Sequence, residues 1–285
     1  MLRDLIHLSR PVHWVKNVFV LLPVPFAIAS GAHIDVRAFL FGLFAFCLAA
    51  SSIYPFNDAQ DAERDRLHEE KRNRPIAAGR ISKGTAYVWS LFLLAVATGL
   101  AYGAGKPAAF LLFVLYVVIN VGYSLGAKHV ALIDVFLLSA MYLLRVLFGC
   151  ALLSVEPSHW LLLCSYALAL FVALTKRRAD LVKGLGGDHR PALEGYTEGF
   201  LDQAIGISAA MTILAYALYS MEAKVLLETR KFAALPFVVF AVLDYLRMAH
   251  LRRAGGSPVD MLLRAPSLLI AGVGWLAATI WSLKW

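Results

Sequence analysis

Charged residues are scarce in this sequence. They make up 16% of its 285 residues, whereas hydrophobic residues make up 60% and the mean hydropathy is +0.69. Soluble domains carry about 25% charged residues. The scarcity of charge excludes an ordinary soluble domain and indicates an integral membrane protein.

Cysteine is scarce as well. Cys47, Cys150 and Cys164 all lie in apolar runs, and their spacing matches neither a metal site nor a disulfide ladder. We interpret them as core residues. A cleavable signal segment is not expected either, because the first apolar run follows a mixed polar segment and is interrupted by Pro23 and Pro25.

Nine apolar runs approach the length that spans a bilayer. Backbone polar groups must be satisfied within lipid, so each run is predicted to be a helix. The prediction is an all-α membrane protein with nine transmembrane helices, formed by a single polytopic domain over residues 1–285. The runs lie at residues 18–34, 38–55, 86–104, 108–124, 131–153, 159–174, 204–221, 232–246 and 265–283.

Most Lys and Arg residues fall between alternate runs, on the side of the N-terminus. This bias predicts that the N-terminus and the long polar connectors, at residues 56–84, 175–203 and 247–264, are cytoplasmic. Topology thus accounts for most of the net charge of +8, and we expect no nucleic-acid partner. The expected location is the cell membrane, with multiple spans.

Acidic residues gather directly after the second run, where the connector 56–84 holds six of the 19. On a helix that continues through this point, one face carries Tyr54, Asn57 or Asp58, Asp61 and Asp65. Clustered carboxylates repel one another, and a hard cation relieves the repulsion. Magnesium is favoured where a phosphate supplies further ligands. The spacing predicts a magnesium diphosphate site.

Basic residues follow the acidic cluster. Lys71, Arg72 and Arg74, closed off by Pro75, can neutralise the outer phosphate oxygens of a bound diphosphate. The alternative is a solvated loop held by salt bridges, which is the usual role of a charge run. The start of the cluster directly at the end of a span favours the site.

The second connector is basic where the first is acidic. Lys176, Arg177 and Arg178 lie at the end of the sixth run, either as positive-inside anchors or as ligands of a phosphate. Residues 188–190 add an acidic, a histidine and a basic side chain further along this connector.

Arg145 lies within an apolar run, where a charge is costly unless it faces a cavity or a partner. Asp134 precedes it by three helical turns on the same face. The two residues either line one cavity or pair with other helices. Tyr123, Lys128 and His129 lie at the mouth of such a cavity, although a lone histidine there is typical of a surface.

Together these residues resemble the UbiA superfamily of intramembrane prenyltransferases. Its pattern Asn-Asp-x-x-Asp-x-x-x-Asp occurs as Asn57, Asp58, Asp61 and Asp65. Within the superfamily, the chain resembles the decaprenyl-phosphate phosphoribosyltransferases. The stretches that carry this likeness are residues 10–17, 57–79, 123–129, 176–180 and 193–197, with a looser match at 256–260. The resemblance implies nine helices around a central cavity.

The resemblance also implies a reaction, the transfer of 5-phosphoribose from phosphoribosyl diphosphate to a polyprenyl phosphate. Its implied metal is Mg2+, held by Asn57 and Asp61 with Asp58 and Asp65 as further or water-mediated ligands. Asp58, Asp61 and Arg145 are the implied catalytic residues. The implied ligands of phosphoribosyl diphosphate are Lys16, Tyr54, Lys71, Arg72, Arg74, Tyr123, Lys128 and Arg145. Lys176 and Arg177 are implied to bind the lipid phosphate.

Some residues depart from the family pattern. Members with aromatic acceptors carry a second acidic motif after the sixth span, where this chain has Lys176 to Arg178 and only Asp180 as an acid. A second anionic substrate fits these cations. In the closer group we also expect Gln at His13 and Ser at Gly195, so local contacts there are in question.

Two other functions stay open. One is a UbiA-type prenyltransferase that joins an isoprenyl diphosphate to an aromatic acceptor, and the other is a transporter with intramembrane charges. The resemblance implies a role in making an arabinose-containing envelope polymer or glycolipid. The sequence leaves the isoprenoid length and the oligomeric state open, and a homo-oligomer is compatible with it.

Overall fold

The computed structural model describes residues 2–67, 71–184, 191–251 and 265–283, and it is helical throughout except for one isolated bridge between Leu226 and Leu283. Among these residues, eight helical segments are long and apolar enough to cross a membrane. A shorter apolar helix of 17 residues occupies the ninth predicted run. The prediction of an all-α membrane protein is confirmed.

Each element after the first span follows the predicted runs closely. Helices α4 to α8 are α4 (Val36–Gln60), α5 (Ala62–Leu67), α6 (Lys83–Gly103), α7 (Pro107–Leu125) and α8 (Ile133–Leu153). The later ones are α9 (His159–Val182), α10 (Glu198–Glu222), α11 (Leu235–Leu251) and α13 (Pro266–Ser282). The 3₁₀ turns between them are η2 (Lys71–Asn73), η3 (Ala127–His129), η4 (Pro191–Gly195) and η5 (Glu228–Arg230).

The first span is broken into short pieces. It consists of α1 (Leu2–Ser9), η1 (Pro11–Asn17), α2 (Val18–Leu21) and α3 (Val24–Ala29), so the run at residues 18–34 is not one helix. Proline removes a backbone donor and clashes with the preceding turn, which explains the breaks near Pro11 and Pro23.

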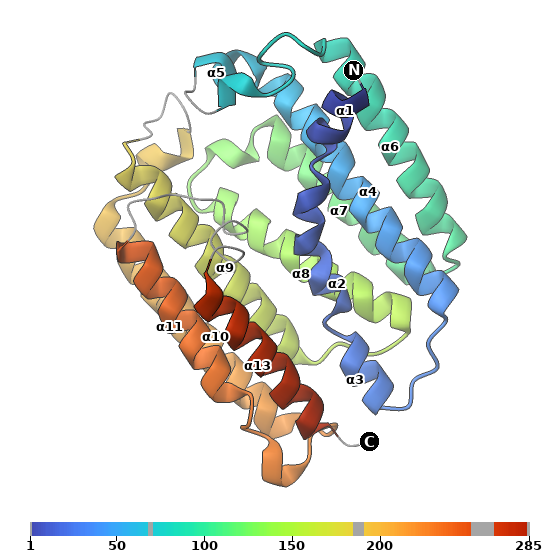
Figure 1. Ribbon diagram of the computed structural model, residues 1–285, viewed down its shortest axis with the longest axis vertical. Helices are drawn as coiled ribbons and strands as arrows, with labels where there is room; N and C mark the ends of the chain where they lie inside the picture. Colours follow the sequence, from blue (N-terminus) through green and yellow to red (C-terminus); the bar gives the residue numbers. More distant parts are fainter. Residues whose placement is uncertain (1, 68–70, 185–190, 252–264, 284–285) are drawn as a thin grey trace.

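Helices that follow one another along the chain mostly pack side by side. Helix α4 contacts α6, α7 and α8, α8 contacts α9, α9 contacts α10, and α11 contacts α13. Figure 1 shows α1, α4 and α6 on one side of the bundle and α10, α11 and α13 on the other. The C-terminal end of α4, the N-terminal end of α8 and the C-terminal end of α9 meet at one end, together with α1, α5 and η2 to η4. We call this the polar end.

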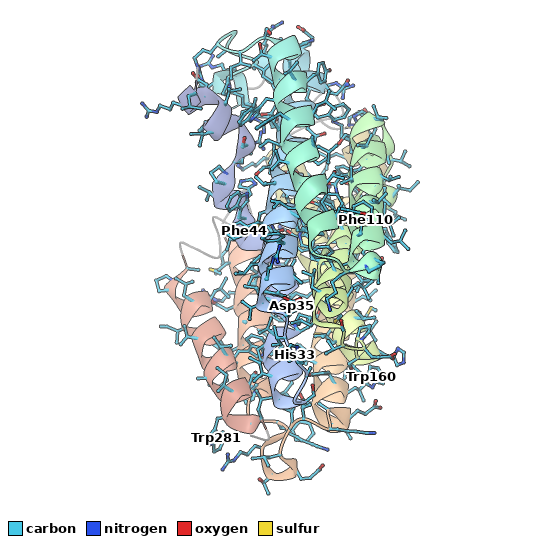
Figure 2. The ribbon with its side chains drawn as sticks, turned by 90° about the vertical axis from the view of Figure 1, so that its right-hand side faces the viewer. His33, Asp35, Phe44, Phe110, Trp160 and Trp281 are labelled. Carbon is cyan, nitrogen blue, oxygen red and sulfur yellow. The ribbon has the colours of Figure 1, made fainter. Side chains whose placement is uncertain are left out.

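The opposite end carries few charges and several aromatic side chains. Figure 2 labels His33, Asp35, Trp160 and Trp281 toward this end. Asp35 caps α4 by accepting a hydrogen bond from the Ala38 amide at 3.0 Å. Tryptophan at the end of a span is typical of the boundary between lipid and water.

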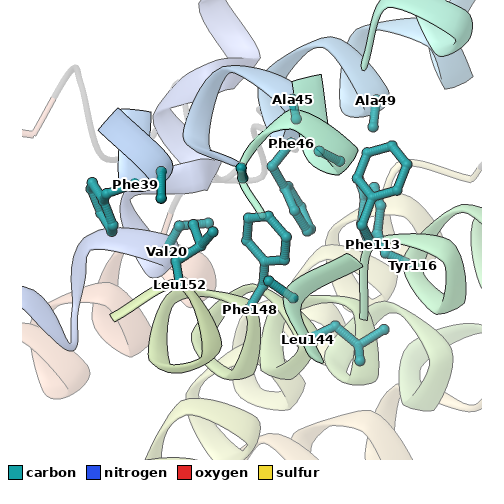
Figure 3. Close-up of a cluster of buried hydrophobic side chains, with 14 of the residues drawn as sticks. Val20, Phe39, Ala45, Phe46, Ala49, Phe113, Tyr116, Leu144, Phe148 and Leu152 are labelled. Atoms are coloured by element: carbon teal, nitrogen blue, oxygen red, sulfur yellow. The ribbon is translucent and has the colours of Figure 1, made fainter. Parts of the chain in front are cut away.

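The largest core cluster joins α2, α4, α7 and α8. Phe46, Phe113 and Phe148 are almost completely buried there, and Figure 3 shows them interleaved with smaller side chains such as Ala45 and Ala49. Helices in lipid gain little from hydrophobic association, so small residues that permit close approach matter for their packing. Gly149 on α8 is the tightest case, because a Cβ there would lie 2.2 Å from the Val20 carbonyl oxygen.

We predict that Gly149→Ala destabilises the bundle. The added methyl meets backbone on α2, which cannot turn aside as a side chain can, so we expect a loss of about 1–3 kcal/mol. Thermal unfolding in detergent measures it. Gly99→Ala on α6 is the matched control, since nothing lies within 4 Å of its added Cβ. Equal melting temperatures for the two variants would contradict the close α2–α8 approach.

Candidate active site

The Asp-rich motif lies where α4 ends at the polar end. Helix α4 continues to Gln60 with Asp61 as its C-cap, and Asp65 lies on the next helix, α5. The Asp61 and Asp65 amides donate to the Asn57 and Asp61 carbonyls. The predicted helical continuation therefore holds for Asn57 and Asp58, and the helix is interrupted at Asp61. Asp58 and Asp65 are each only 3% exposed. Their burial is unlike the solvated loop that was the alternative interpretation.

Each carboxylate of the motif is paired with a cation from another element. Arg10 Nη2 donates to both Asp58 oxygens, at 2.6 and 2.7 Å. Arg74 Nη1 joins two acids, with Asp58 Oδ1 at 3.0 Å and Asp65 Oδ2 at 2.7 Å. Burial raises the pKa of the Asp65 carboxyl, and Arg74 opposes that shift by favouring the charged form.

Asp61 is paired separately from the other two. Lys128 Nζ, on η3, lies 2.8 Å from both of its oxygens, and the Lys128 side chain is 13% exposed. Next to this pair, Arg64 on α5 contacts the His129 ring at 3.0 Å. The pair connects the end of α4 to the turn before α8.

The donor atoms at the motif fit a magnesium ion that arrives with an anion. Over the described ranges, no three acidic, Cys or His side chains already surround one point. Asn57 Oδ1, however, is buried without a hydrogen-bond partner. A buried acceptor without a donor is costly, and a hard oxygen of this kind is what magnesium binds. Asn57 and Asp61 can therefore hold the ion once Lys128 has another anionic partner.

Arg145 on α8 is buried, at 6% exposure, and its hydrogen-bond partners are neutral. Its Nε donates to Asn17 Oδ1 at 3.0 Å, and Asn17 in turn donates to Cys47 Sγ at 3.2 Å. Its other two nitrogens donate to the Met141 carbonyl and the Tyr116 hydroxyl.

Aromatic rings surround the same guanidinium. Its central carbon lies 4.9–5.5 Å from three ring centroids, those of Phe46, Tyr116 and Tyr142. Ring faces stabilise a cation without neutralising it. No carboxylate in the described part of the chain forms an ion pair with Arg145. Its positive charge is therefore available to an anionic ligand.

The structure shows how Asp134 and Arg177 are paired. Asp134, fully buried, pairs with Arg177 Nε on α9, which is the second of the two arrangements left open by the sequence. Arg177 is itself 0% exposed, and its Nη1 contacts Asp180 at 3.3 Å. Because α9 continues to Val182, residue 177 lies on a helix and not in a polar connector. Arg177 Nη2 is buried without a hydrogen-bond partner among the described residues.

The other predicted residues lie around these groups. Tyr54 contacts His13 Nδ1 through its hydroxyl at 3.1 Å, and the Arg10 guanidinium lies 4.9 Å from its ring. Lys71 Nζ lies 4.0 Å from Asp65, whereas Arg72 is exposed. Half-buried positions are occupied by Lys16 on η1, Tyr123 on α7 and Lys176 on α9. Residues 68–70, 188–190 and 256–260 lie outside the described residues.

Sequence reasoning assigned no role to Arg10, Asn17, Tyr116 or Tyr196. Arg10 and Asn17 are the first and last residues of the stretch 10–17, which carries part of the family resemblance. That stretch could therefore have indicated both residues as members of the site. Tyr116 lies within an apolar run like any core aromatic residue. Only the folded arrangement shows that its hydroxyl faces Arg145.

Known proteins resemble this chain in sequence and in fold. The model of the UbiA prenyltransferase family matches residues 17–254. A decaprenyl-phosphate phosphoribosyltransferase of Corynebacterium glutamicum is 33% identical over 280 residues, 94% of this chain and 82% of that protein. One from Mycobacterium tuberculosis is 32% identical, covering 94% of this chain and 90% of that protein. A UbiA homolog from Archaeoglobus fulgidus, solved with GPP and Mg2+, has a TM-score of 0.75 at 20% identity, over 97% of this chain and 98% of that one.

We predict that Arg145→Met weakens the binding of phosphoribosyl diphosphate in the presence of Mg2+ about 10- to 100-fold, the value of a hydrogen bond to a charged group. Isothermal titration calorimetry measures the affinity. The melting temperature of Arg145→Met should not fall along with its affinity, because Met removes a buried charge that no carboxylate compensates.

Arg37→Met is the control, since Arg37 is also stacked on a ring, that of Phe41, but lies at the start of α4. An unchanged affinity for phosphoribosyl diphosphate in Arg145→Met would remove this arginine from the site.

Proposed function

The chain belongs to the UbiA prenyltransferase family and is a transferase, and from this premise we propose that it moves 5-phosphoribose from phosphoribosyl diphosphate to a polyprenyl phosphate, with release of diphosphate. The observation that carries the choice of acceptor is the likeness, over 94% of the chain, to proteins named decaprenyl-phosphate phosphoribosyltransferase. The end of α9 agrees with this choice, because Lys176, Arg177 and Arg178 stand there in place of a second acidic motif. Arg177 pairs with Asp134 and Asp180, and Arg178 pairs with Glu198 and Asp202.

The donor site is the acidic cluster at the end of α4. Asn57 and Asp61 would hold a magnesium ion, with Asp58 and Asp65 as further or water-mediated ligands. Bound there, the ion would stabilise the negative charge of the departing diphosphate. Lys128, Arg74 and Arg10 contact the carboxylates in the structure and can contact diphosphate oxygens once the ion neutralises those acids. Lys71 and Arg72 lie beside them.

The ribose phosphate of the donor would be bound farther inside. Arg145 offers an uncompensated buried charge there, and Lys16 and Tyr54 are half-buried on η1 and α4. Tyr123 on α7 is a further contact for the ribose. These residues orient the anomeric carbon toward the acceptor and exclude water from it. Positioning of the reactants therefore contributes much of the rate enhancement.

The reaction needs no general base. A phosphate oxygen of the lipid, already ionised at neutral pH, attacks the anomeric carbon as the bond to the diphosphate oxygen breaks. The electron pair leaves with the diphosphate, and the configuration at that carbon inverts. Electrostatic stabilisation of the leaving group is then the main catalytic contribution.

The acceptor would lie with its isoprenoid among the apolar helices and its phosphate near Lys176. Arg177 would be the second contact for this phosphate, because its guanidinium is buried against Asp134 but its Nη2 has no hydrogen-bond partner among the described residues. The positive-inside bias supports a cytoplasmic polar end, and both substrates would enter the site from that side. The protein would thus act as a multi-pass protein of the cell membrane.

A transfer assay tests the proposal. Protein in phospholipid vesicles is incubated with Mg2+, phosphoribosyl diphosphate labelled in the ribose, and decaprenyl phosphate, and the organic phase is counted. We expect label in the lipid, dependent on the lipid phosphate and abolished by EDTA. A parallel reaction contains a labelled isoprenyl diphosphate and an aromatic acid. Labelled aromatic product with no labelled phosphoribosyl lipid would replace the proposal by the prenyltransferase alternative.

We predict that Asp61→Ala lowers transfer by at least about 100-fold, the scale of losing one preorganised electrostatic group. The initial rate in the vesicle assay measures it, and gel filtration in detergent checks that the protein is folded. Glu63→Ala is the control, because Glu63 lies in the same segment but is exposed and paired only with Arg66 and Lys83. Near-wild-type turnover in Asp61→Ala would exclude the metal site from the reaction.

A further inference from the structure

We propose that Tyr196 is a positioning residue for the diphosphate site: it holds the backbone turn that presents Lys128 to Asp61. The inference rests on the proposed role of Lys128 at the diphosphate, but not on which diphosphate is the donor. Tyr196 follows η4, far along the chain from the Asp-rich motif, and touches neither Lys128 nor Asp61 directly.

Tyr196 makes two hydrogen bonds to the start of α8. Its hydroxyl accepts from the Leu132 amide at 2.7 Å and donates to Asp134 Oδ1 at 2.7 Å. The side chain is 5% exposed, so water offers little replacement for either bond. Asp134 is held in turn by Arg177 on α9, which makes the tyrosine part of a buried network that joins η4, α8 and α9.

The turn that Tyr196 holds is strained. Leu132 has φ 65° and ψ −48°, and the Ile133 amide donates to the Ala131 carbonyl at 2.8 Å, as in a γ-turn. A positive φ is unfavourable for leucine and persists only where the surroundings enforce it. The Leu132 side chain is 45% exposed and cannot enforce it by packing. The bond from its amide to Tyr196 is therefore the anchor of the turn.

A close contact between Gly195 and the Ala131 side chain supports the same turn. A Cβ at Gly195 would lie 2.5 Å from the Ala131 Cβ, so η4 rests directly on the residue before Leu132. Glycine is required here by the approach of two chain segments. Tyr196 and Gly195 thus fix two consecutive residues of the turn from the same side.

The turn at Leu132 determines the position of Lys128. It lies on η3, four residues before Leu132, and its Nζ reaches both Asp61 oxygens at 2.8 Å. A relaxed turn at Leu132 moves the end of η3, and the lysine then meets the acid or a bound diphosphate less often. Loss of the Tyr196 bonds should therefore weaken diphosphate binding without removing any group from the site.

The test is a double-mutant cycle of Tyr196→Phe and Lys128→Ala, read by calorimetric titration of full-length protein with inorganic diphosphate and Mg2+. We expect Tyr196→Phe to weaken binding about 10-fold in the wild-type background and by less than about 2-fold in Lys128→Ala, since coupled residues are not additive. Tyr216→Phe is the matched control. It also loses a tertiary hydrogen bond, from Trp275 at 3.0 Å, but between α10 and α13.

Equal weakening by Tyr196→Phe in both backgrounds, or none in either, would overturn the inference. No diphosphate binding by the wild-type protein would overturn it together with the proposed site. Coupled binding without phosphoribosyl transfer would overturn only the proposed function. The two failures are thus distinguishable.

A second pair of variants covers the case in which Tyr196→Phe does not fold. Gly195→Ala should push η4 away from residue 131 and weaken diphosphate binding, and adding Ala131→Gly should restore the affinity to within about 2-fold, because it removes the Cβ that the new methyl meets. Failure of the double variant to recover affinity while both proteins remain folded would count against the inference.

Discussion

The neutralisation of buried carboxylates is the constraint on which the polar end depends. Asp58 and Asp65 are each 3% exposed, and a buried acid without a partner is strongly destabilising. Arg74 bridges both acids, and Arg10 grips Asp58 from the N-terminal segment. These pairs attach η1 and η2 to the end of α4. A buried apolar cluster that includes Leu5, Leu8, Ala59, Ala62 and Ile76 joins the adjoining segments, so charge and hydrophobic contact together fix this arrangement.

The same neutralisation determines what the site can bind. A metal ion alone would leave Arg10, Arg74 and Lys128 without their anions, and a diphosphate alone would meet carboxylates of its own sign. When a metal diphosphate binds, each carboxylate pairs with the metal ion and each cation pairs with the diphosphate. The metal ion and the diphosphate should therefore each raise the affinity of the site for the other, and the coupling is reciprocal. Arg145 differs, because its neutral partners leave a net positive charge that favours an anion before any exchange.

Local patterns predicted the helices and the acidic face, whereas the pairing of charges needed the fold. The three- and four-residue steps correctly placed Asn57 and Asp58 on a continuing helix, whereas Asp65 lies on the next helix, α5. Asp134 was related to Arg145 because both lie on one run, yet its partner is Arg177 on another helix. An apolar run ends at the first cluster of charges, but α9 continues through it, since Lys and Arg are good helix formers.

The burial of Arg177 determines how the neighbouring basic side chains are oriented. Consecutive residues on a helix point about 100° apart, so the burial of Arg177 against Asp134 fixes the directions of Lys176 and Arg178 as well. Arg178 is engaged by Glu198 and Asp202 on α10. Lys176 is thereby held at a set angle to α8, whose first turn follows Lys128. A single buried ion pair thus relates the cation proposed for the acceptor to the cation proposed for the donor site.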